Sequence, residues 1–299
     1  RRRWLANLGL LAIGSVALRA AFPLAATGVA LWAQQQSWGL LNQIEWPALL
    51  ELIIAVAVLD CAIYWQHRVF HRLPWLWRLH SVHHADTALD VTTGLRFHPI
   101  ELLLSMVIKS VFIVALGAPA LAVLIFEVVL NACSMFNHSN IALPNTLEHS
   151  LRRVLITPTL HRIHHSQRIE ETNSNFGFSV PWWDWLFGSF RAHAREGDAA
   201  VRLGLPGAQN FMAYNAPAGT APPPSLRWPV TDQTPRGGWT VDPALAFAHA
   251  LQESNFREAV VSGANAIGLM QIRPIAAREY AASINLSADA NLKEASTNL

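Results

Sequence analysis

Residues 80–84 read HSVHH and residues 161–165 read HRIHH, so one arrangement of three histidines occurs twice in the chain. On a helix, positions i, i+3 and i+4 are neighbours on the surface, which predicts three imidazoles on one side of each segment. A third group precedes the first copy, because His67 and His71 in HRVFH are four residues apart. The spacing therefore predicts three helical segments, each with one histidine-bearing face.

These eight histidines are too many to be ordinary buried residues. Burying polar groups without partners is costly, and few carboxylates lie nearby in the sequence to pair with them. Imidazole binds zinc, copper, iron and nickel. A tetrahedral zinc ion needs only four ligands, so eight histidines fit two ions better than one. Two ions held by nitrogen favour oxygen chemistry at iron, and the spacing alone leaves zinc open.

The composition is typical of a membrane protein. Hydrophobic residues make up 52% of the 299 residues and charged residues only 14%, whereas soluble domains contain about 25% charged residues. The net charge of +2 gives no broad basic field, so we expect no nucleic acid partner.

Four apolar stretches flank the histidine groups. Residues 4–32 and 47–66 are each long enough to cross a bilayer, which takes about 20 residues. Residues 102–116 and 118–136 are shorter and predict either two tilted spans or one re-entrant hairpin. Arginines accompany the histidine groups, and the positive-inside rule then predicts that all the groups face the cytoplasm.

The composition changes after about residue 205. Residues 206–239 are rich in proline and glycine and predict a linker. Residues 240–299 have no apolar stretch long enough to cross a membrane and predict a small helical segment. We therefore expect a membrane domain over residues 1–205, a linker over 206–239 and a separate segment over 240–299.

Five motifs in this order resemble the fatty acid hydroxylase and sterol desaturase superfamily. They are DCAIYWQHRVFHRLPWLWRLHSVHH (60–84), RFHPIE (96–101), FNHSN (136–140), TPTLHRIHHS (157–166) and WWDWLFGSF (182–190). The resemblance implies an all-α integral membrane oxygenase, with a cytoplasmic histidine-rich cap over a helical membrane stem. It also implies two non-heme iron ions, O₂ as co-substrate, a lipid substrate from the bilayer and a separate electron donor. Hydroxylation and desaturation both remain open.

The same resemblance implies a set of ten metal ligands. Eight of them are the histidines above: His67, His71, His80, His83, His84, His161, His164 and His165. His98 and His138 complete the set, either as ligands or as residues that contact a ligand. His149, His193 and His249 fall in no motif, and we expect no metal role for them.

Four kinds of neighbouring residue have predicted roles. Asp60 either orients a histidine ligand or bonds between helices. For Glu101 we favour a role at a helix start over support of a ligand. Asn175 is expected in a turn and Asp184 in structural hydrogen bonds. The tryptophans of the last motif, Trp182, Trp183 and Trp185, resemble an interfacial aromatic belt.

Residues 241–281 resemble the opening half of a lytic transglycosylase domain with a lysozyme-like fold. The matching pieces are QESNF (252–256), AVVSGANAIGLMQIRP (259–274) and the later DANL (289–292). The resemblance implies that Glu253 is a catalytic acid, whose pKa would be raised by an apolar setting, and that Ser254, Gly268, Met270 and Gln271 shape a cleft. Because only about 55 residues match, we expect this partial segment to be inactive.

Three functions are therefore compared below. The first is a membrane-bound di-iron lipid hydroxylase or desaturase in the inner membrane of a bacterium. The second is a membrane-anchored peptidoglycan lytic transglycosylase acting through Glu253. The third is a metal-binding membrane protein without redox turnover.

Overall fold

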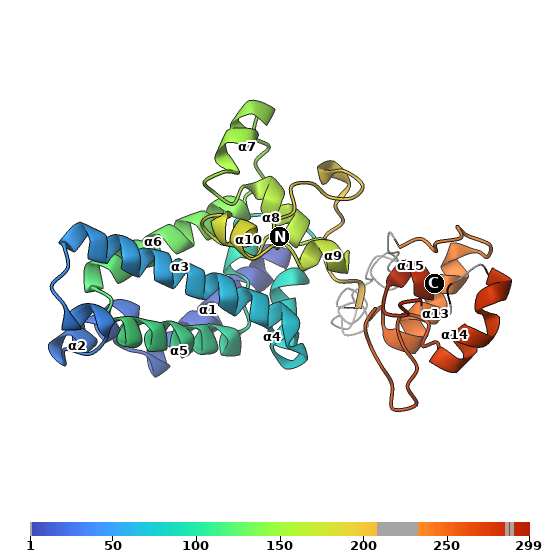
Figure 1. The fold of residues 1–299 in the computed structure, drawn as a ribbon, viewed down its shortest axis with the longest axis horizontal. Coiled ribbons are helices and arrows are strands. Elements are labelled where there is room, and N and C mark those ends of the chain that lie inside the picture. The colour runs from blue at the N-terminus through green and yellow to red at the C-terminus, as the bar shows by residue number, and fades with distance from the viewer. Residues whose placement is uncertain (1, 208–232, 285–286, 288–289) are drawn as a thin grey trace. The chain divides into compact units, whose positions relative to one another are not determined.

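The computed structural model describes residues 2–207, 233–284, 287 and 290–299 (Figure 1). The chain divides into two compact units, Arg1–Gly204 and Leu205–Leu299. Every regular element in the described residues is a helix, and strand pairing is limited there to isolated bridges. The all-α prediction is therefore confirmed. Most of the predicted linker over 206–239 lies outside the described residues.

Four long helices form the stem of the first unit. They are α1 (Arg2–Ala21), α3 (Ala48–Arg72), α5 (Pro99–Leu116) and α6 (Ala120–Asn137). The stretches long and apolar enough to cross a membrane are Arg3–Gln43, Ala48–Arg72, Pro99–Leu116 and Ala120–Asn137. Many apolar side chains on their outer surfaces are exposed, such as Leu49, Val111 and Val128. The protein is therefore a multi-pass membrane protein.

Pro23 interrupts the first apolar stretch. The proline cannot donate a helical hydrogen bond, and α1 ends at Ala21 before α2 (Ala25–Gln35) begins. A short helix, η1 (Leu40–Gln43), then leads to α3. The two shorter stretches form separate 18-residue helices, α5 and α6.

A glycine contact packs η1 against the turn between α5 and α6. Gly117 ends α5 in the left-handed conformation, with φ of 71°. A Cβ built on Gly39 would lie 2.0 Å from the backbone nitrogen of Gly117. Only glycine fits so close an approach, so this contact fixes the turn at the end of the stem opposite the histidines.

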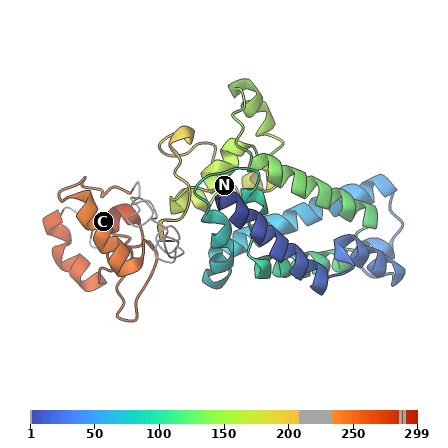
Figure 2. The same ribbon diagram turned by 180° about the vertical axis from the view of Figure 1, so that it is seen from behind.

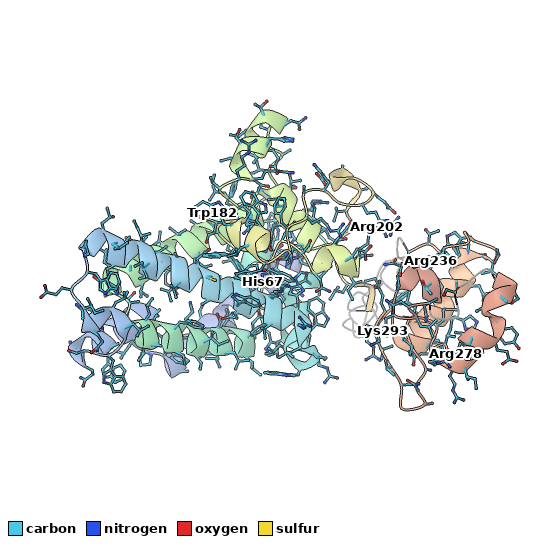
Figure 3. All side chains as sticks on the ribbon, viewed as in Figure 1. His67, Trp182, Arg202, Arg236, Arg278 and Lys293 are labelled. Carbon is cyan, nitrogen blue, oxygen red and sulfur yellow. The ribbon has the colours of Figure 1, made fainter. Side chains whose placement is uncertain are left out.

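The cap is a set of shorter helices gathered at one end of the stem (Figures 1 and 2). It comprises α4 (Pro74–His84), η2 (Thr93–Leu95), α7 (Asn145–Leu151), α8 (Pro158–His164), α9 (Ile169–Thr172), α10 (Trp182–Leu186) and η3 (Asp198–Ala200). Figure 3 shows His67 at the cap end of α3 and Trp182 on α10. Both views place the N-terminus near the cap and α2 at the other end of the stem.

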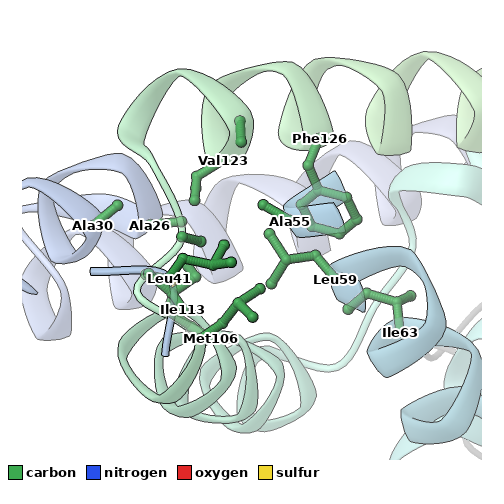
Figure 4. Close-up of a cluster of buried hydrophobic side chains, with 13 residues drawn as sticks. Ala26, Ala30, Leu41, Ala55, Leu59, Ile63, Met106, Ile113, Val123 and Phe126 are labelled. Atoms are coloured by element: carbon green, nitrogen blue, oxygen red, sulfur yellow. The ribbon is translucent and has the colours of Figure 1, made fainter. Parts of the chain in front are cut away.

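Small and branched side chains fill the centre of the stem (Figure 4). Leu59 of α3, Ile113 of α5 and Phe126 of α6 are each 1% exposed. Ala30 of α2 and Ala55 of α3 are fully buried, which lets neighbouring backbones approach closely. This packing sets the positions of α3, which carries His67, and of α6, which ends next to His138.

The second unit contains α13 (Pro243–Ser254), α14 (Pro274–Tyr280), η4 (Ala281–Ile284) and α15 (Ala295–Asn298). Asn298 is 1% exposed. Its amide nitrogen donates to the carbonyls of Ile267 and Leu292, and its oxygen accepts from the backbone of Met270 at 2.6 Å. One side chain thus fastens the loop that carries the GLMQ motif.

Candidate metal centre

Nine histidines converge in two groups at the junction of cap and stem. In each group, one ring nitrogen from every member lies within 4.8 Å of those of the others. The first group is His67, His71, His80, His84 and His164, and the second is His83, His138, His161 and His165. The chain therefore presents two sets of nitrogen donors of the size that two metal ions need.

Each three-histidine motif is divided between the groups. In α4, His80 and His84 join the first group and His83 joins the second. In the segment of α8, His164 joins the first and His161 and His165 join the second. Positions four apart share a helix face more closely than positions three apart, since one turn takes 3.6 residues. The two motifs thus lie between the groups and connect them.

Hydrogen bonds fix which nitrogen carries the proton in several rings. The Nδ1 atoms of His67, His138 and His164 face the carbonyls of Phe176, Ser134 and Ser174 at 2.7–2.8 Å. His83 Nδ1 faces the carbonyl of Arg96 at 3.2 Å. A carbonyl only accepts, so each Nδ1 must donate. In the neutral ring, Nε2 then presents a lone pair to the interior of the site.

These lone pairs point at one another. His83 Nε2 and His138 Nε2 are 3.1 Å apart, and so are His67 Nε2 and His80 Nε2. His161 Nε2 lies 2.9 Å from His138 Nε2 and 3.2 Å from His165 Nε2. Metal–nitrogen bonds of about 2.0–2.1 Å place two ligands of one ion about 3 Å apart. The spacing fits a metal ion between the rings.

Burial keeps the imidazoles of the cap neutral. Desolvation lowers the pKa of His138 to about 4 and that of His164 to about 3. Burial, followed by the neighbouring imidazoles, lowers the pKa of His83, His84, His161 and His165 well below the ordinary value. Metal binding requires the neutral form of imidazole, so the residues fit the donor chemistry of a bound metal.

Some ring nitrogens form no hydrogen bond in the part of the chain that the structure describes. Both ring nitrogens of His84 and Nε2 of His164 are buried there without a hydrogen-bond partner. An unsatisfied buried polar atom destabilises the fold. A bound cation would satisfy these atoms.

His98 lies outside both groups. Its Nδ1 accepts from the backbone of Ile100 at 3.2 Å and caps the start of α5, directly before Pro99. The ring is partly exposed and is held there by its place at the helix start. The structure therefore separates His98 from His138, which the motifs alone treated alike.

Glu101 supports a ligand instead of acting only at the helix start. Its Oε1 lies 2.6 Å from His80 Nδ1, and both side chains are buried. Glu101 also lies in the first turn of α5, as we favoured from the sequence, and the contact with His80 adds a second role. A carboxylate on the outer nitrogen fixes the tautomer of a histidine ligand and raises its basicity.

Asp60 and Asp184 form structural contacts beneath the cap. Asp60 Oδ2 accepts from the indole of Trp183 at 2.7 Å, so of its two predicted roles the bond between elements is the one present. Asp184 accepts from the backbone nitrogens of Phe176 and Gly177 and from Ser189 Oγ. These bonds hold the segment whose Phe176 carbonyl orients His67.

Asn175 and the tryptophans of α10 complete this layer. Asn175 has a φ of 50° and is fully buried. Its amide bonds to the carbonyls of Leu160 and Arg191, which ties α8 to the segment after α10. Trp182 and Trp185 are 51% and 45% exposed, as an interfacial belt requires.

A polar network attaches the N-terminus of α1 to the loop after α4. Asp86 Oδ2 accepts from Arg3, Asn7 and Thr93 at 2.7–3.0 Å, and Arg3 also pairs with Asp90. In the same loop the guanidinium of Arg96 donates to Asn7 Oδ1 and to the Val82 carbonyl. The Arg96 carbonyl in turn accepts from His83, so the network positions a ring of the second group.

A cavity of about 210 Å³ reaches the first histidine group from within the stem. Its lining includes His67, His80 and Glu101 at one end and apolar residues such as Ile63, Leu102 and Phe178 along its walls. Lys109 and Glu127 line it as well. The sequence motifs gave no signal for this cavity, because its lining is shared among α1, α3, α4, α5, α6 and the segments between them.

The second unit places Glu253 near the end of α13, with an exposed side chain. Ser254 is buried and bonds back to the carbonyl of Ala250. Gln271 has a φ of 48° and donates to the carbonyl of Gly268. Within the described residues, Glu253 therefore lacks the apolar surroundings expected of a catalytic acid.

Comparison with known proteins supports this division of the chain. Residues 52–189 match the model of the fatty acid hydroxylase family. Residues 233–299 match the transglycosylase SLT domain. Both resemblances drawn from the motifs are thereby confirmed. No solved structure matches the chain significantly.

Several curated proteins are similar to the fatty acid hydroxylase part. The ornithine lipid hydroxylase OlsE of Rhizobium tropici is 29% identical over 58% of this chain and 51% of its own length. The alkylglycerol monooxygenase of Homo sapiens is 28% identical over 44% of the chain and 29% of its own length. A putative Delta(7)-sterol-C5(6)-desaturase of Arabidopsis thaliana is 26% identical over 50% of the chain. The chain thus spans about half the length of the first of these relatives.

Proposed function

We propose that this protein is a membrane-bound lipid hydroxylase or desaturase that uses two iron ions, O₂ and electrons from a separate donor. The observation that carries the proposal is the pair of histidine groups whose Nε2 lone pairs face one another. The names of the similar proteins support a lipid as the substrate. All-nitrogen donor sets suit iron as well as zinc, and the oxidative chemistry of the relatives favours iron.

Each of the two histidine groups would bind one of the two ions. His67, His71, His80, His84 and His164 would hold one ion, and His83, His138, His161 and His165 the other. When bound, the two irons supply the oxidising power that an unactivated C–H bond requires. Glu101 fixes His80 by its 2.6 Å bond, and the carbonyls of Phe176, Ser134 and Ser174 fix three other rings.

The surroundings of the site would exclude water and admit a lipid. Phe97 stacks on His83 with ring centroids 4.6 Å apart. Phe176 packs edge-on against His67 and His164. The cavity that reaches His67 and His80 is lined in part by apolar side chains inside the stem, such as Ile63, Leu102 and Phe178. An acyl chain can therefore reach the metals sideways from the bilayer without crossing water.

The cap would lie on the cytoplasmic side of a bacterial inner membrane. The connections at the other end of the stem, residues 22–47 and 117–119, contain no lysine or arginine. Arginines gather at the cap end, among them Arg3, Arg72, Arg78, Arg153 and Arg162. This asymmetry supports a cytoplasmic cap under the positive-inside rule. A soluble electron donor of that compartment could then reach the site.

The proposal is tested by metal analysis and lipid mass spectrometry on the full chain expressed in a bacterial host. We expect about two irons per chain and a lipid product heavier by one oxygen or lighter by two hydrogens. His164→Ala should abolish the product, whereas His149→Ala, an exposed histidine of α7 outside both groups, should leave it unchanged. Zinc in place of iron, with no lipid difference between wild type and His164→Ala, would instead favour a metal-binding protein without turnover.

The alternative function is a peptidoglycan lytic transglycosylase acting through Glu253. The match of residues 233–299 supports it, and the exposed position of Glu253 weakens it. Release of muropeptides from purified peptidoglycan by the wild type, and its loss in Glu253→Gln, would establish this activity.

A further inference from the structure

The cavity below the first histidine group contains an ion pair in the middle of the stem. Lys109 Nζ of α5 lies 2.6 Å from Glu127 Oε1 of α6. Both side chains line the cavity that also reaches His67 and His80. Glu101, which bonds to His80, stands eight residues before Lys109 on α5, a distance of about 12 Å along the helix.

This ion pair is costly where it stands. Charged side chains within a membrane-spanning helix are rare and mostly line a cavity or a path for a ligand. An ion pair taken out of water is weak support for stability, because losing the hydration of both charges offsets their attraction. Apolar side chains such as Ile113 of α5 and Phe126 of α6 fill the nearby centre of the stem without any charge.

The pair also stands near the outer end of the cavity. Lys109 and Glu127 are 15% and 27% exposed, and the neighbouring Asn131, which also lines the cavity, is exposed. His67 and His80 at the inner end are 3% and 1% exposed. The cavity therefore runs from the surface of the stem, past the ion pair, to the buried histidines.

We infer that Lys109 and Glu127 recognise a neutral polar group of the lipid that both donates and accepts hydrogen bonds: an amide or a hydroxyl. This inference rests on the proposed function and specifies its substrate class. Lysine has three N–H donors, of which the bond to Glu127 uses one. The carboxylate of Glu127 has acceptor capacity beyond that bond.

The net charge of Lys109 and Glu127 determines which polar group of the lipid fits between them. Together the two side chains are electrically neutral, so a fully charged ligand group would bring an unbalanced charge into a medium of low dielectric constant. An ester accepts hydrogen bonds and donates none, which leaves Glu127 without a new partner. An amide or a hydroxyl satisfies both side chains at once. Held there, the lipid would extend along the cavity toward His67 and His80.

Photo-crosslinking of the full-length protein in lipid nanodiscs tests the inference. Three probes share one sixteen-carbon chain with a mid-chain diazirine and differ in the polar end: an N-methyl amide, a primary alcohol and a methyl ester. We expect the amide or the alcohol to label the peptides that line the cavity roughly tenfold more than the ester, as one additional hydrogen bond to the charged Glu127 would give. The amide and alcohol arms show which of the two groups is preferred.

Variants separate recognition from packing. All three probes should label the double variant Lys109→Met, Glu127→Leu alike. Lys109→Arg should keep the preference for the amide or the alcohol over the ester. A competition experiment tests the same preference without any variant. The amide lipid without a diazirine should reduce labelling of the wild type more than the ester lipid without a diazirine does. Equal labelling by amide, alcohol and ester in the wild type, or an unchanged preference in the double variant, would overturn the inference. Labelling needs neither iron nor turnover, so its result is independent of the iron and product measurements that test the oxygenase.

Discussion

His83 and His138 face each other across the second histidine group with their Nε2 atoms 3.1 Å apart. Both Nδ1 atoms are engaged by carbonyl oxygens, those of Arg96 and Ser134. Neither ring can therefore donate to the other while both are neutral. Two lone pairs at this distance repel, and a metal ion between them turns the repulsion into two bonds. The local geometry by itself thus favours a cation at this position.

The first prediction separates His138 from His98, which occupy similar histidine motifs. We expect His138→Ala to lower the iron content by at least half and to weaken the remaining metal binding at least about tenfold, since even an outer partner of a ligand has an effect of that size. His98→Ala should retain both irons, because its ring caps α5 and points its Nδ1 at the backbone of Ile100. Iron per chain measured by elemental analysis checks both. Equal loss in the two variants would contradict the assignment.

The second prediction concerns the bond between Glu101 and His80. Removing the carboxylate in Glu101→Ala frees the ring of His80 to change tautomer and orientation, so metal affinity should fall about 10- to 100-fold. Glu101→Gln keeps an oxygen that can accept from Nδ1 and should lose less. Titration with a competing chelator measures the affinity of each variant. The ranking wild type, then glutamine, then alanine is the outcome that supports a positioning role; indistinguishable glutamine and alanine variants would point to the charge alone.

The third prediction tests the network that holds the N-terminus of α1 against the loop after α4. Asp86→Asn weakens the acceptor shared by Arg3, Asn7 and Thr93 and should destabilise the first unit by about 1–3 kcal/mol. Asp198→Asn is the matched control, since Asp198 pairs with the largely exposed His193 and such surface pairs contribute about 0–1 kcal/mol. Thermal unfolding in detergent measures both. If Asp198→Asn is destabilised as much as Asp86→Asn, the network does not stabilise the first unit more than a surface ion pair does.

The spacing of the histidines was sufficient to predict that the three motifs form one site on helices. Within each motif the spacing sets His83 and His164 apart from the two histidines that are four residues apart, but which histidines of the other segments they join depends on how α3, α4 and α8 cross. His98 carried a signal that could have set it apart: it directly precedes Pro99, the pattern of a residue at a helix start followed by proline at the first helical position.

Long-range partners were beyond the reach of the sequence. Glu101 and His80 are 21 residues apart, and Lys109 and Glu127 are 18 apart on different helices. In the sequence, Lys109 is a single charged residue within the apolar stretch 102–116. Its partner and the cavity beside it follow from the arrangement of the stem helices in space, which hydrophobic patterning does not specify.

The last prediction concerns the independence of the two units. Glu253 belongs to the second compact unit, Leu205–Leu299, and both histidine groups to the first. Glu253→Gln should therefore leave iron content and lipid products at wild-type levels. Because Glu253 is exposed and lacks an apolar pocket in the described residues, neither protein should release muropeptides. Parallel lipid mass spectrometry and muropeptide analysis of the two proteins measure both activities. Loss of lipid oxidation in Glu253→Gln would show that the units act together, and muropeptide release by the wild type alone would assign the second unit a catalytic role of its own.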